Sequence, residues 1–156
     1  MQKQTDKAHD YNLDVSDIEP LVCHVAMLWR RLVGLRIKNL KVSITERRVL
    51  YCIMRHPGLT QVQIAKKLDL EPQNLLRILD KLEKNKWITK CIDPKDRRIK
   101  CLKITPESKK IISQIDKITA EVKKEVLEDV DLKKIQTTVD NLGSIRKNLL
   151  ELLDRE

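Results

Sequence analysis

The fold of this chain is decided by residues 60–104, which read TQVQIAKKLDLEPQNLLRILDKLEKNKWITKCIDPKDRRIKCLKI. The first half carries two helical patterns, and the second half carries two β-rich runs on either side of a charged turn. Between Lys84 and Lys103 there are eight lysines and arginines and two aspartates, a net charge of +6 out of +9 for the chain. Such a concentration favours a polyanion-binding surface, because each neutralised phosphate releases counterions. A solvated charged face is the alternative explanation.

Two helices are predicted in the first half of this stretch. Thr60 and Gln63 have the spacing of a capping box, and Pro72 suits the first turn of a second helix that runs to about Asn85. At about 100° per residue, the polar residues of this second helix share a sector about 120° wide. They are Gln73, Asn74, Arg77, Asp80, Lys81 and Lys84. Glutamine, asparagine and arginine can bond to adenine and guanine edges, so we expect this face to read DNA bases.

A β-hairpin is predicted in the second half. Residues 87–92 and 99–104 are rich in β-forming side chains, and the loop between them is too polar to pack against a core. Cys91 and Cys101 flank this loop symmetrically, so they could face each other across the strands, and a regulatory disulfide there is one hypothesis. Cys23 is a second redox candidate, for which a buried core thiol is the alternative.

Long helices are predicted on both sides of this unit. Apolar residues recur at helical period over about 17–39, 106–128 and 131–154, with Asp17 and Thr105 as caps of the first two. Ser43 and Glu46 form a further capping box, and Pro57-Gly58 ends the helix behind it. The long helices carry more apolar surface than one small domain can cover, so we expect a homodimer. Residues 1–14 are polar and aperiodic, as in a flexible arm.

Composition excludes several classes of function. At 156 residues, one domain over 15–156 is expected. Two Trp, two Tyr and no Phe argue against single-strand binding by base stacking. No apolar run reaches the roughly 18–20 residues of a membrane span, and no signal sequence precedes the domain, so a cytoplasmic protein is expected. Neither a Gly-rich phosphate loop nor zinc-ligand spacing is present, so no enzyme, metal site or cofactor is predicted.

A family resemblance rests on three segments. They are LEPQNLLRILDKLE at 70–83, Asp96-Arg97-Arg98 in the hairpin loop, and LKIT at 102–105. Over about 44–112 the chain resembles the MarR family of transcriptional regulators, and within it the SlyA-like branch. The resemblance implies a mainly α fold with a small β-hairpin. It would consist of a winged helix-turn-helix over about 44–105 inside a helical dimerisation frame.

The resemblance also implies a homodimer that binds pseudo-palindromic double-stranded DNA. Gln73, Asn74 and Arg77 occupy positions that enter the major groove, and Lys81 lies on the same face. Arg97 is expected in the adjacent minor groove, whereas Arg98 either takes that place or holds the wing against Asp96 or a neighbouring element. The residues expected to contact phosphates are Thr60, Gln61, Lys90, Lys95 and Lys100.

Two positions depart from the family pattern. Asn85 stands near the helix end where members commonly have glycine, and we expect it to adopt the left-handed conformation. Asn74 stands where a small hydroxyl residue is common, which leaves the base preference at this contact open.

An effector site is a further implication of the resemblance. Many members bind small phenolic or aromatic carboxylate ligands in a cleft between the dimer frame and the DNA-binding lobe. The residues on the elements that would line it are His24, Met27, Arg31 and Arg55. Ordinary core or surface side chains are the alternative reading of these four.

Two other functions compete with a DNA-binding regulator. One is a winged-helix protein-interaction module, which would show no steep salt dependence toward DNA. The other is a redox sensor of the same fold, which depends on a reactive cysteine. The operator, the regulated genes and the choice between repressor and activator do not follow from the sequence.

Overall fold

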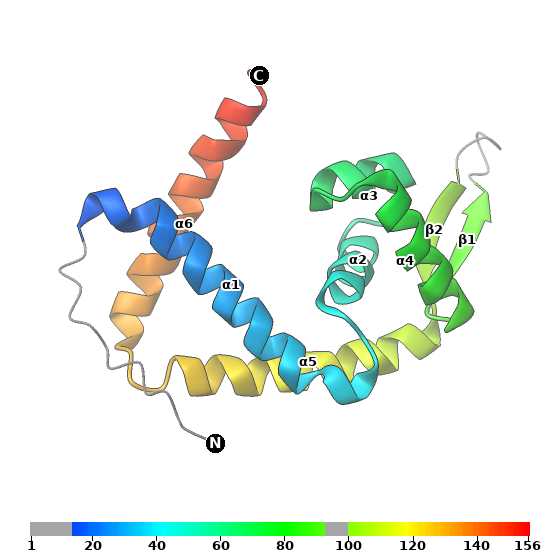
Figure 1. The fold of residues 1–156 in the computed structure, drawn as a ribbon, viewed down its shortest axis with the longest axis horizontal. Helices are drawn as coiled ribbons and strands as arrows, with labels where there is room; N and C mark the ends of the chain where they lie inside the picture. The colour runs from blue at the N-terminus through cyan, green and yellow to red at the C-terminus, as the bar shows by residue number, and fades with distance from the viewer. Residues whose placement is uncertain (1–13, 93–99) are drawn as a thin grey trace. The chain divides into compact units, whose positions relative to one another are not determined.

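The structure is a computed structural model that describes residues 14–92 and 100–156 (Figure 1). Its elements are η1 (Val15–Asp17), α1 (Ile18–Arg36), η2 (Lys38–Leu40), α2 (Ile44–Arg55), α3 (Gln61–Leu68), α4 (Pro72–Lys84), β1 (Ile88–Ile92), β2 (Lys100–Ile104), α5 (Pro106–Val126) and α6 (Leu132–Leu153). The mainly helical fold with one antiparallel hairpin is the fold class that the sequence predicts. All but the last residue of the expected arm 1–14 lies outside the described residues, as does the tip of the hairpin.

The helix bounds agree with the expected ranges to within a few residues. The helix expected over 17–39 is divided into α1 and the short η2, because Ile37 leaves the helical geometry at ψ 0°. Asp17 is not the side-chain cap that the sequence suggested. The side chain of Asp14 instead accepts from the backbone N–H of Ser16, and Asp17 accepts from that of Asp14.

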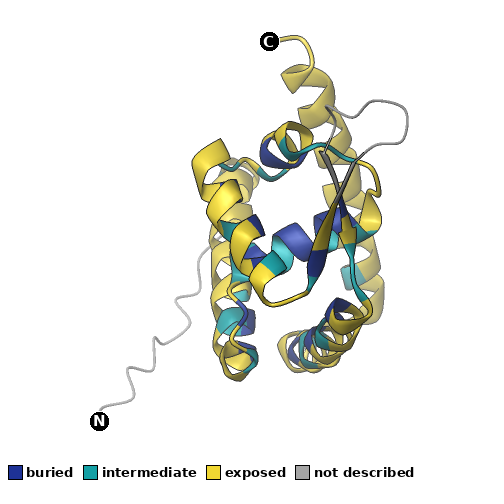
Figure 2. Ribbon diagram, turned by 90° about the vertical axis from the view of Figure 1, so that its right-hand side faces the viewer, coloured by how far each residue is buried: buried dark blue, intermediate teal, exposed yellow. Residues whose placement is uncertain are grey.

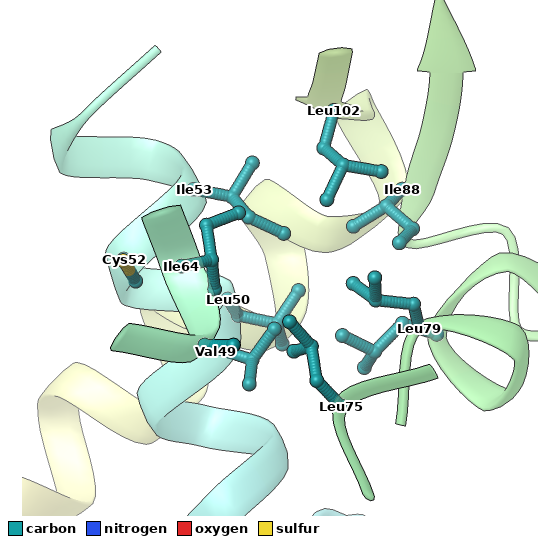
Figure 3. Packing of buried hydrophobic residues seen from close by; sticks show 11 residues of the cluster. Val49, Leu50, Cys52, Ile53, Ile64, Leu75, Leu79, Ile88 and Leu102 are labelled. Carbon is teal, nitrogen blue, oxygen red and sulfur yellow. The ribbon is translucent and has the colours of Figure 1, made fainter. Parts of the chain in front are cut away.

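The winged-helix core is a closed cluster of buried side chains from α2, α3, α4 and both strands (Figure 3). Its members are Val49, Leu50, Cys52, Ile53, Ile64, Ala65, Leu75, Leu79, Leu82, Ile88 and Leu102. Burying one leucine or isoleucine contributes about 1.5–3 kcal/mol, so this cluster is the main source of stability for the winged-helix region.

Local signals fix the starts of α2 and α3. Ser43 Oγ accepts from the N–H of Glu46 at 3.1 Å, and the Glu46 carboxylate accepts from the N–H of Ser43 at 2.9 Å. Thr60 and Gln63 form the same reciprocal pair at 3.3 and 2.9 Å. Both predicted capping boxes are therefore confirmed.

In the turn after α4, the residue with left-handed conformation is not the one that the sequence predicted. Asn85 has φ −78° and ψ 0°, and Lys86 takes the left-handed conformation at φ 60°. The helix cap is at Asn85, so the left-handed position comes one residue later. Lys86 N–H donates to Glu83 at 2.8 Å and Trp87 N–H donates to Leu82 at 2.9 Å. This pair of bonds is a Schellman motif, which favours glycine at the place of Lys86.

The hairpin is antiparallel, and its register pairs Ile88 with Ile104 and Cys91 with Cys101. The two cysteines thus lie directly opposite along the backbone, as their symmetric spacing suggested. The base of the hairpin is tied to the start of α5, since Thr105 Oγ1 donates to the carbonyl of Lys86 at 2.6 Å. The same oxygen accepts from the N–H of Ser108 at 3.2 Å, which confirms Thr105 as the cap.

Contacts divide the chain into two compact units, 1–118 and 119–156, and α5 runs from one into the other. In the first unit, α1 buries only Val33 among its own residues. In the second, α6 buries none, and Figure 2 shows the helix that ends at the C-terminus mostly as exposed. Within the described residues, no helix is long and apolar enough to cross a membrane.

Candidate nucleic-acid interface

The polar face of α4 is exposed, as the helical angles predicted. Gln73, Asn74 and Arg77 are exposed, whereas Leu75 and Leu79 on the other side are buried in the winged-helix core. All three polar residues lie in the first two turns, next to the helix start at Pro72. Bidentate amide and guanidinium groups gathered at one end of an exposed helix can reach base edges in a major groove.

Two hollows flank this end of α4. One, of about 390 Å³, lies beside Asn74 and Arg77 and is bordered by Ser43 and Thr45 at the start of α2. The other, of about 310 Å³, lies between α3 and α4 and is lined mainly by apolar side chains. The first turns of α4 therefore border a hollow with partly polar lining and a hollow with mainly apolar lining.

The apolar hollow contains two residues that the sequence analysis missed. Val62 of α3 is 78% exposed and Leu76 of α4 is 47% exposed. The predicted polar sector of the helix did not include Leu76, which lies next to the edge of that sector at about 100° per residue. The angular position of Leu76 was thus the signal available to find it.

Thr60 and Gln61 stand at the start of α3, where both are half-buried. The Thr60 hydroxyl accepts from the backbone N–H of Gln63, so it is held at the helix N-terminus. A helix start carries unsatisfied N–H groups and a partial positive charge, which suits a phosphate contact. Phosphate contacts by Thr60 and Gln61 remain a prediction.

Lys81 is held by a buried carboxylate. Its Nζ lies 2.6 Å from Glu46 Oε1, and the side chain of Glu46 is only 6% exposed whereas that of Lys81 is 52% exposed. Glu46 is also the capping residue of α2, so this ion pair fastens α4 to the beginning of α2. The structure gives Lys81 a positioning role in addition to the expected place on the polar face.

Lys90 is likewise engaged with carboxylates. Its Nζ lies 2.6 Å from Glu83 Oε2 and 3.3 Å from Asp80 Oδ1. The hydrogen bond to Glu83, followed by that to Asp80, raises the pKa of Lys90 above its ordinary value. The two bonds connect β1 to α4, and they offset the charge that a phosphate contact would use. Surface pairs of this kind contribute about 0–1 kcal/mol, so the main effect is orientation of the hairpin.

The remaining expected contacts fall largely outside the described residues. Lys95, Arg97 and Arg98 belong to the hairpin tip at 93–99, and of Lys100 only the backbone in β2 is described. Their roles stay predictions.

The four residues expected at an effector site are all exposed but are not gathered in one hollow. His24, Met27 and Arg31 lie on α1, and Arg55 ends α2. Arg55 lines a hollow of about 300 Å³ on α2 and α3 with other basic residues, and the three α1 residues are not part of that lining.

The cysteines of α1 and α2 differ in environment. Cys23 is exposed, and its Sγ is 3.7 Å from the Glu19 carboxylate, so the buried core thiol considered for it is wrong. Cys52 is buried, and burial raises the pKa of its thiol. A raised pKa disfavours the reactive thiolate, so Cys52 is suited to core packing rather than redox chemistry.

Residues 42–100 match the family model of MarR, and this range holds α2, α3, α4 and β1. The winged-helix region of this chain is thus similar to the MarR family. Members of the MarR family are transcription regulators rather than enzymes. The matched range begins close to residue 44, where the resemblance was placed, and ends before residue 112.

Several solved structures share the fold over most of the chain. Wild-type MarR from E. coli in its apo form has a TM-score of 0.75 at 22% identity, over 82% of this chain and 96% of that chain. The transcriptional regulator PA3341 has a TM-score of 0.75 at 28% identity, over 85% and 98%. CouR from Rhodococcus jostii RHA1, bound to p-coumaroyl-CoA, has a TM-score of 0.70 at 22% identity, over 83% and 91%. The likeness to MarR and CouR establishes the shared fold.

Proposed function

We propose that this protein is a transcriptional regulator that binds pseudo-palindromic double-stranded DNA as a homodimer. The observation that carries the proposal is the exposed edge of Gln73, Asn74 and Arg77 on an α4 whose other face is buried in a MarR winged helix. Arg77 is suited to the O6 and N7 atoms of guanine, and Gln73 and Asn74 to adenine.

Phosphate contacts would set the register of the protein on the duplex. Thr60 and Gln61 at the start of α3 suit this role, as do the hairpin lysines Lys95 and Lys100. Lys90 and Lys81 would contribute less, because their ammonium groups already bind carboxylates. To bind a phosphate, Lys90 would have to give up its bond to Glu83. Lys90 would therefore act mainly by orienting the hairpin.

The hairpin tip would reach the minor groove. Arg97 is the proposed minor-groove residue, and A·T-rich narrowing of that groove strengthens the negative potential that attracts a guanidinium. Arg98 is proposed to hold the wing in place. This division follows the family resemblance.

Val62 and Leu76 add an apolar component to the same surface. Both are exposed at the hollow between α3 and α4, and Leu76 lies one turn after Gln73. An apolar side chain at this place can contact the C5-methyl group of thymine. Replacing a selected thymine by deoxyuridine, which lacks only that methyl group, should weaken binding of the parent protein. The same replacement should not affect Leu76→Ala if Leu76 makes the contact.

The homodimer is supported by the apolar surface left open on α1 and α6. The exposed apolar residues are Ile18, Leu21, Val22, Val25, Met27, Leu28 and Leu35 on α1 and Leu132, Val139, Leu142, Ile145, Leu149, Leu150, Leu152 and Leu153 on α6. A second copy of the chain can cover these apolar stripes, since most soluble oligomers are symmetric assemblies of one chain. Two recognition helices would then address half-sites about 34–36 Å apart.

Modulation by a small aromatic ligand is part of the proposal. CouR, which shares the fold, is described in complex with p-coumaroyl-CoA. A ligand that prefers a dimer with mismatched half-site spacing would lower DNA affinity. His24, Met27, Arg31 and Arg55 are the proposed contacts, although the hollow that Arg55 lines does not include the three α1 residues. The SlyA-like assignment is proposed with it. A cytoplasmic location is also proposed, since the role requires access to DNA.

Selection of bound sequences from a random duplex pool would test the proposal. We expect an inverted repeat, and binding whose affinity falls steeply as salt rises. On the selected operator, Arg77→Ala should cost about 1–3 kcal/mol and relax discrimination at one base pair. Arg97→Ala should weaken binding with little change in major-groove preference. Lys124→Ala, at an exposed position of α5, is the control, because it removes one positive charge from a helix that holds none of the proposed contacts.

Other outcomes would redirect the assignment. If no sequence is enriched and the salt dependence is shallow, the winged helix is a protein-interaction module. If peroxide changes DNA affinity and Cys23→Ser abolishes the change, the protein is a redox-sensing regulator.

A further inference from the structure

A second positively charged site lies on the winged-helix region, away from the proposed DNA contacts. It is the hollow of about 300 Å³ on α2 and α3, and its basic lining residues are Arg47, Arg48, Arg55, His56 and Lys67. Lys67 comes from the last turn of α3, whereas the proposed phosphate contacts Thr60 and Gln61 stand at the opposite end of that helix. The hollow is therefore distinct from the surface expected to bind DNA.

Tyr51 organises two of the arginines at this hollow. The guanidinium carbon of Arg47 lies 5.0 Å from the centre of the Tyr51 ring, and that of Arg55 lies 5.4 Å from it. The Tyr51 hydroxyl donates to Asp116 of α5, which fixes the ring. Cation–π contacts with a fixed ring hold both guanidinium groups at the hollow before any ligand arrives.

The other two permanent cations have different surroundings. Arg48 is anchored, because its Nη2 donates to the carbonyl of Leu68 at 2.7 Å and so holds α2 against α3. Lys67 is exposed. The lining of the hollow also includes Cys52 and Leu68, so it is partly apolar.

The charges of this hollow are not compensated by its own lining. No aspartate or glutamate belongs to the lining, and within residues 14–92 and 100–156 no ion pair joins a carboxylate to Arg55 or Lys67. Lys81 and Lys90 differ from them in this respect, since both have a carboxylate partner at 2.6 Å. In addition, Arg47 Nε is buried without a hydrogen-bond partner in the described part of the chain. Four permanent like charges at one hollow repel each other, and a multivalent anion would relieve this repulsion.

We propose that the α2–α3 hollow binds a small organic polyanion, a phosphate ester or polycarboxylate that carries at least two negative charges. A single carboxylate would leave most of the four permanent cations uncompensated, whereas two or more anionic groups can bond to Arg55, Lys67 and Arg47 together. A volume of about 300 Å³ is at the small end of known ligand sites and matches a compact metabolite rather than a macromolecule. The proposal does not depend on the DNA-binding function, but it shares Arg55 with the contacts proposed above for an aromatic ligand.

Titration calorimetry of the full chain without DNA, at constant ionic strength, tests this site with pyrophosphate and citrate as probes. We expect saturable binding that weakens about tenfold or more in Arg55→Gln and in Lys67→Gln, since each removes a charge-assisted bond. Lys66→Gln is the matched control. It removes the same charge from the neighbouring residue of α3, which lines the apolar hollow instead. Circular dichroism of each variant checks that the fold is retained.

Several results would overturn the proposal. Equal weakening in Lys66→Gln would mean diffuse attraction to a chain of net charge +9 rather than a site. Absence of binding at millimolar pyrophosphate and citrate, or tighter binding of the monoanion benzoate, would reject the polyanion class. If Arg55→Gln and Lys67→Gln weakened binding of duplex DNA as much as binding of pyrophosphate, the hollow would belong to the DNA surface. If the parent protein did not bind DNA at all, the proposal for this hollow would still stand, because binding of pyrophosphate and citrate is measured without DNA.

Discussion

The winged-helix region and α6 contain apolar residues at similar helical spacing, yet they bury them very differently. In the first, α2, α3, α4 and the hairpin enclose a cluster in which Leu79 and Leu82 are 0% exposed. In the second, no residue of α6 is buried, and Leu149 is 54% exposed. An apolar stripe therefore predicts that a face will be covered, but it does not identify what covers it.

The largest effect is expected where the core is closed. Leu79→Ala should destabilise the protein by about 2–5 kcal/mol, because it leaves a cavity among side chains that cannot fully relax. Leu76→Ala, the same change on the same helix, should cost much less, since Leu76 is 47% exposed. Urea unfolding of both variants measures the difference. Similar losses would mean that the buried and exposed faces of α4 are not as distinct as described.

The next effect should appear on α6 as a change of assembly rather than of fold. Leu149→Asp should raise the dissociation constant of the proposed dimer by about 100-fold or more, because a buried unpaired carboxylate is costly. Asn148→Asp adds the same charge one residue away from the apolar seam and should leave the dimer intact. Sedimentation of both variants over a range of concentrations provides the measurement. A parent chain that sediments as a monomer would refute the dimer altogether.

A smaller effect is expected in the turn that follows α4, at the edge of the winged-helix region. Lys86→Gly should stabilise the protein by about 0.5–1 kcal/mol, because left-handed strain of about 1–2 kcal/mol is released and part is offset by unfolded-chain entropy. Asn85→Gly should destabilise by a similar amount, since Asn85 has a right-handed conformation at φ −78°. Thermal unfolding distinguishes the two signs. If Asn85→Gly were the stabilising change, the left-handed residue would have been assigned to the wrong position.

The smallest effect is expected at Tyr51 of α2, whose hydroxyl donates to Asp116 of α5. Burial, followed by the hydrogen bond to Asp116, raises the pKa of Tyr51 to about 12, above the unfolded value of about 10. A phenol with a raised folded pKa contributes stability below pH 10, and this contribution is lost as pH rises toward 12. The difference in stability between the parent and Tyr51→Phe should therefore shrink over that range. Denaturant unfolding at several pH values measures it, and a constant difference would exclude the coupling.

Local chemistry made much of the fold predictable. Ser43 and Thr60 cap their helices through side chains only three residues away, so sequence spacing alone predicted both starts. The exposed edge of α4 followed from helical angles in the same way. The left-handed residue was misplaced because it depends on where the helix stops, and helix ends are less sharply encoded than helix starts.

Contacts between residues distant in sequence account for the features that the sequence pattern did not predict. Lys81 was expected on the polar face, but Glu46, from another helix, holds it. The cationic hollow gathers Arg47 and Arg55 of α2 with Lys67 of α3, and neither helix alone indicates it. Leu76 was assigned to neither face of the predicted helix, and it is 47% exposed at the hollow between α3 and α4.

The sequence by itself determined the order of helices and strands, the two capping boxes and the polar edge of α4, because these depend on interactions within a few residues. The tertiary structure alone decided which cations have carboxylate partners and which gather at a hollow without them. Charges interact through space, so their pairing depends on how helices pack and not on their separation along the chain.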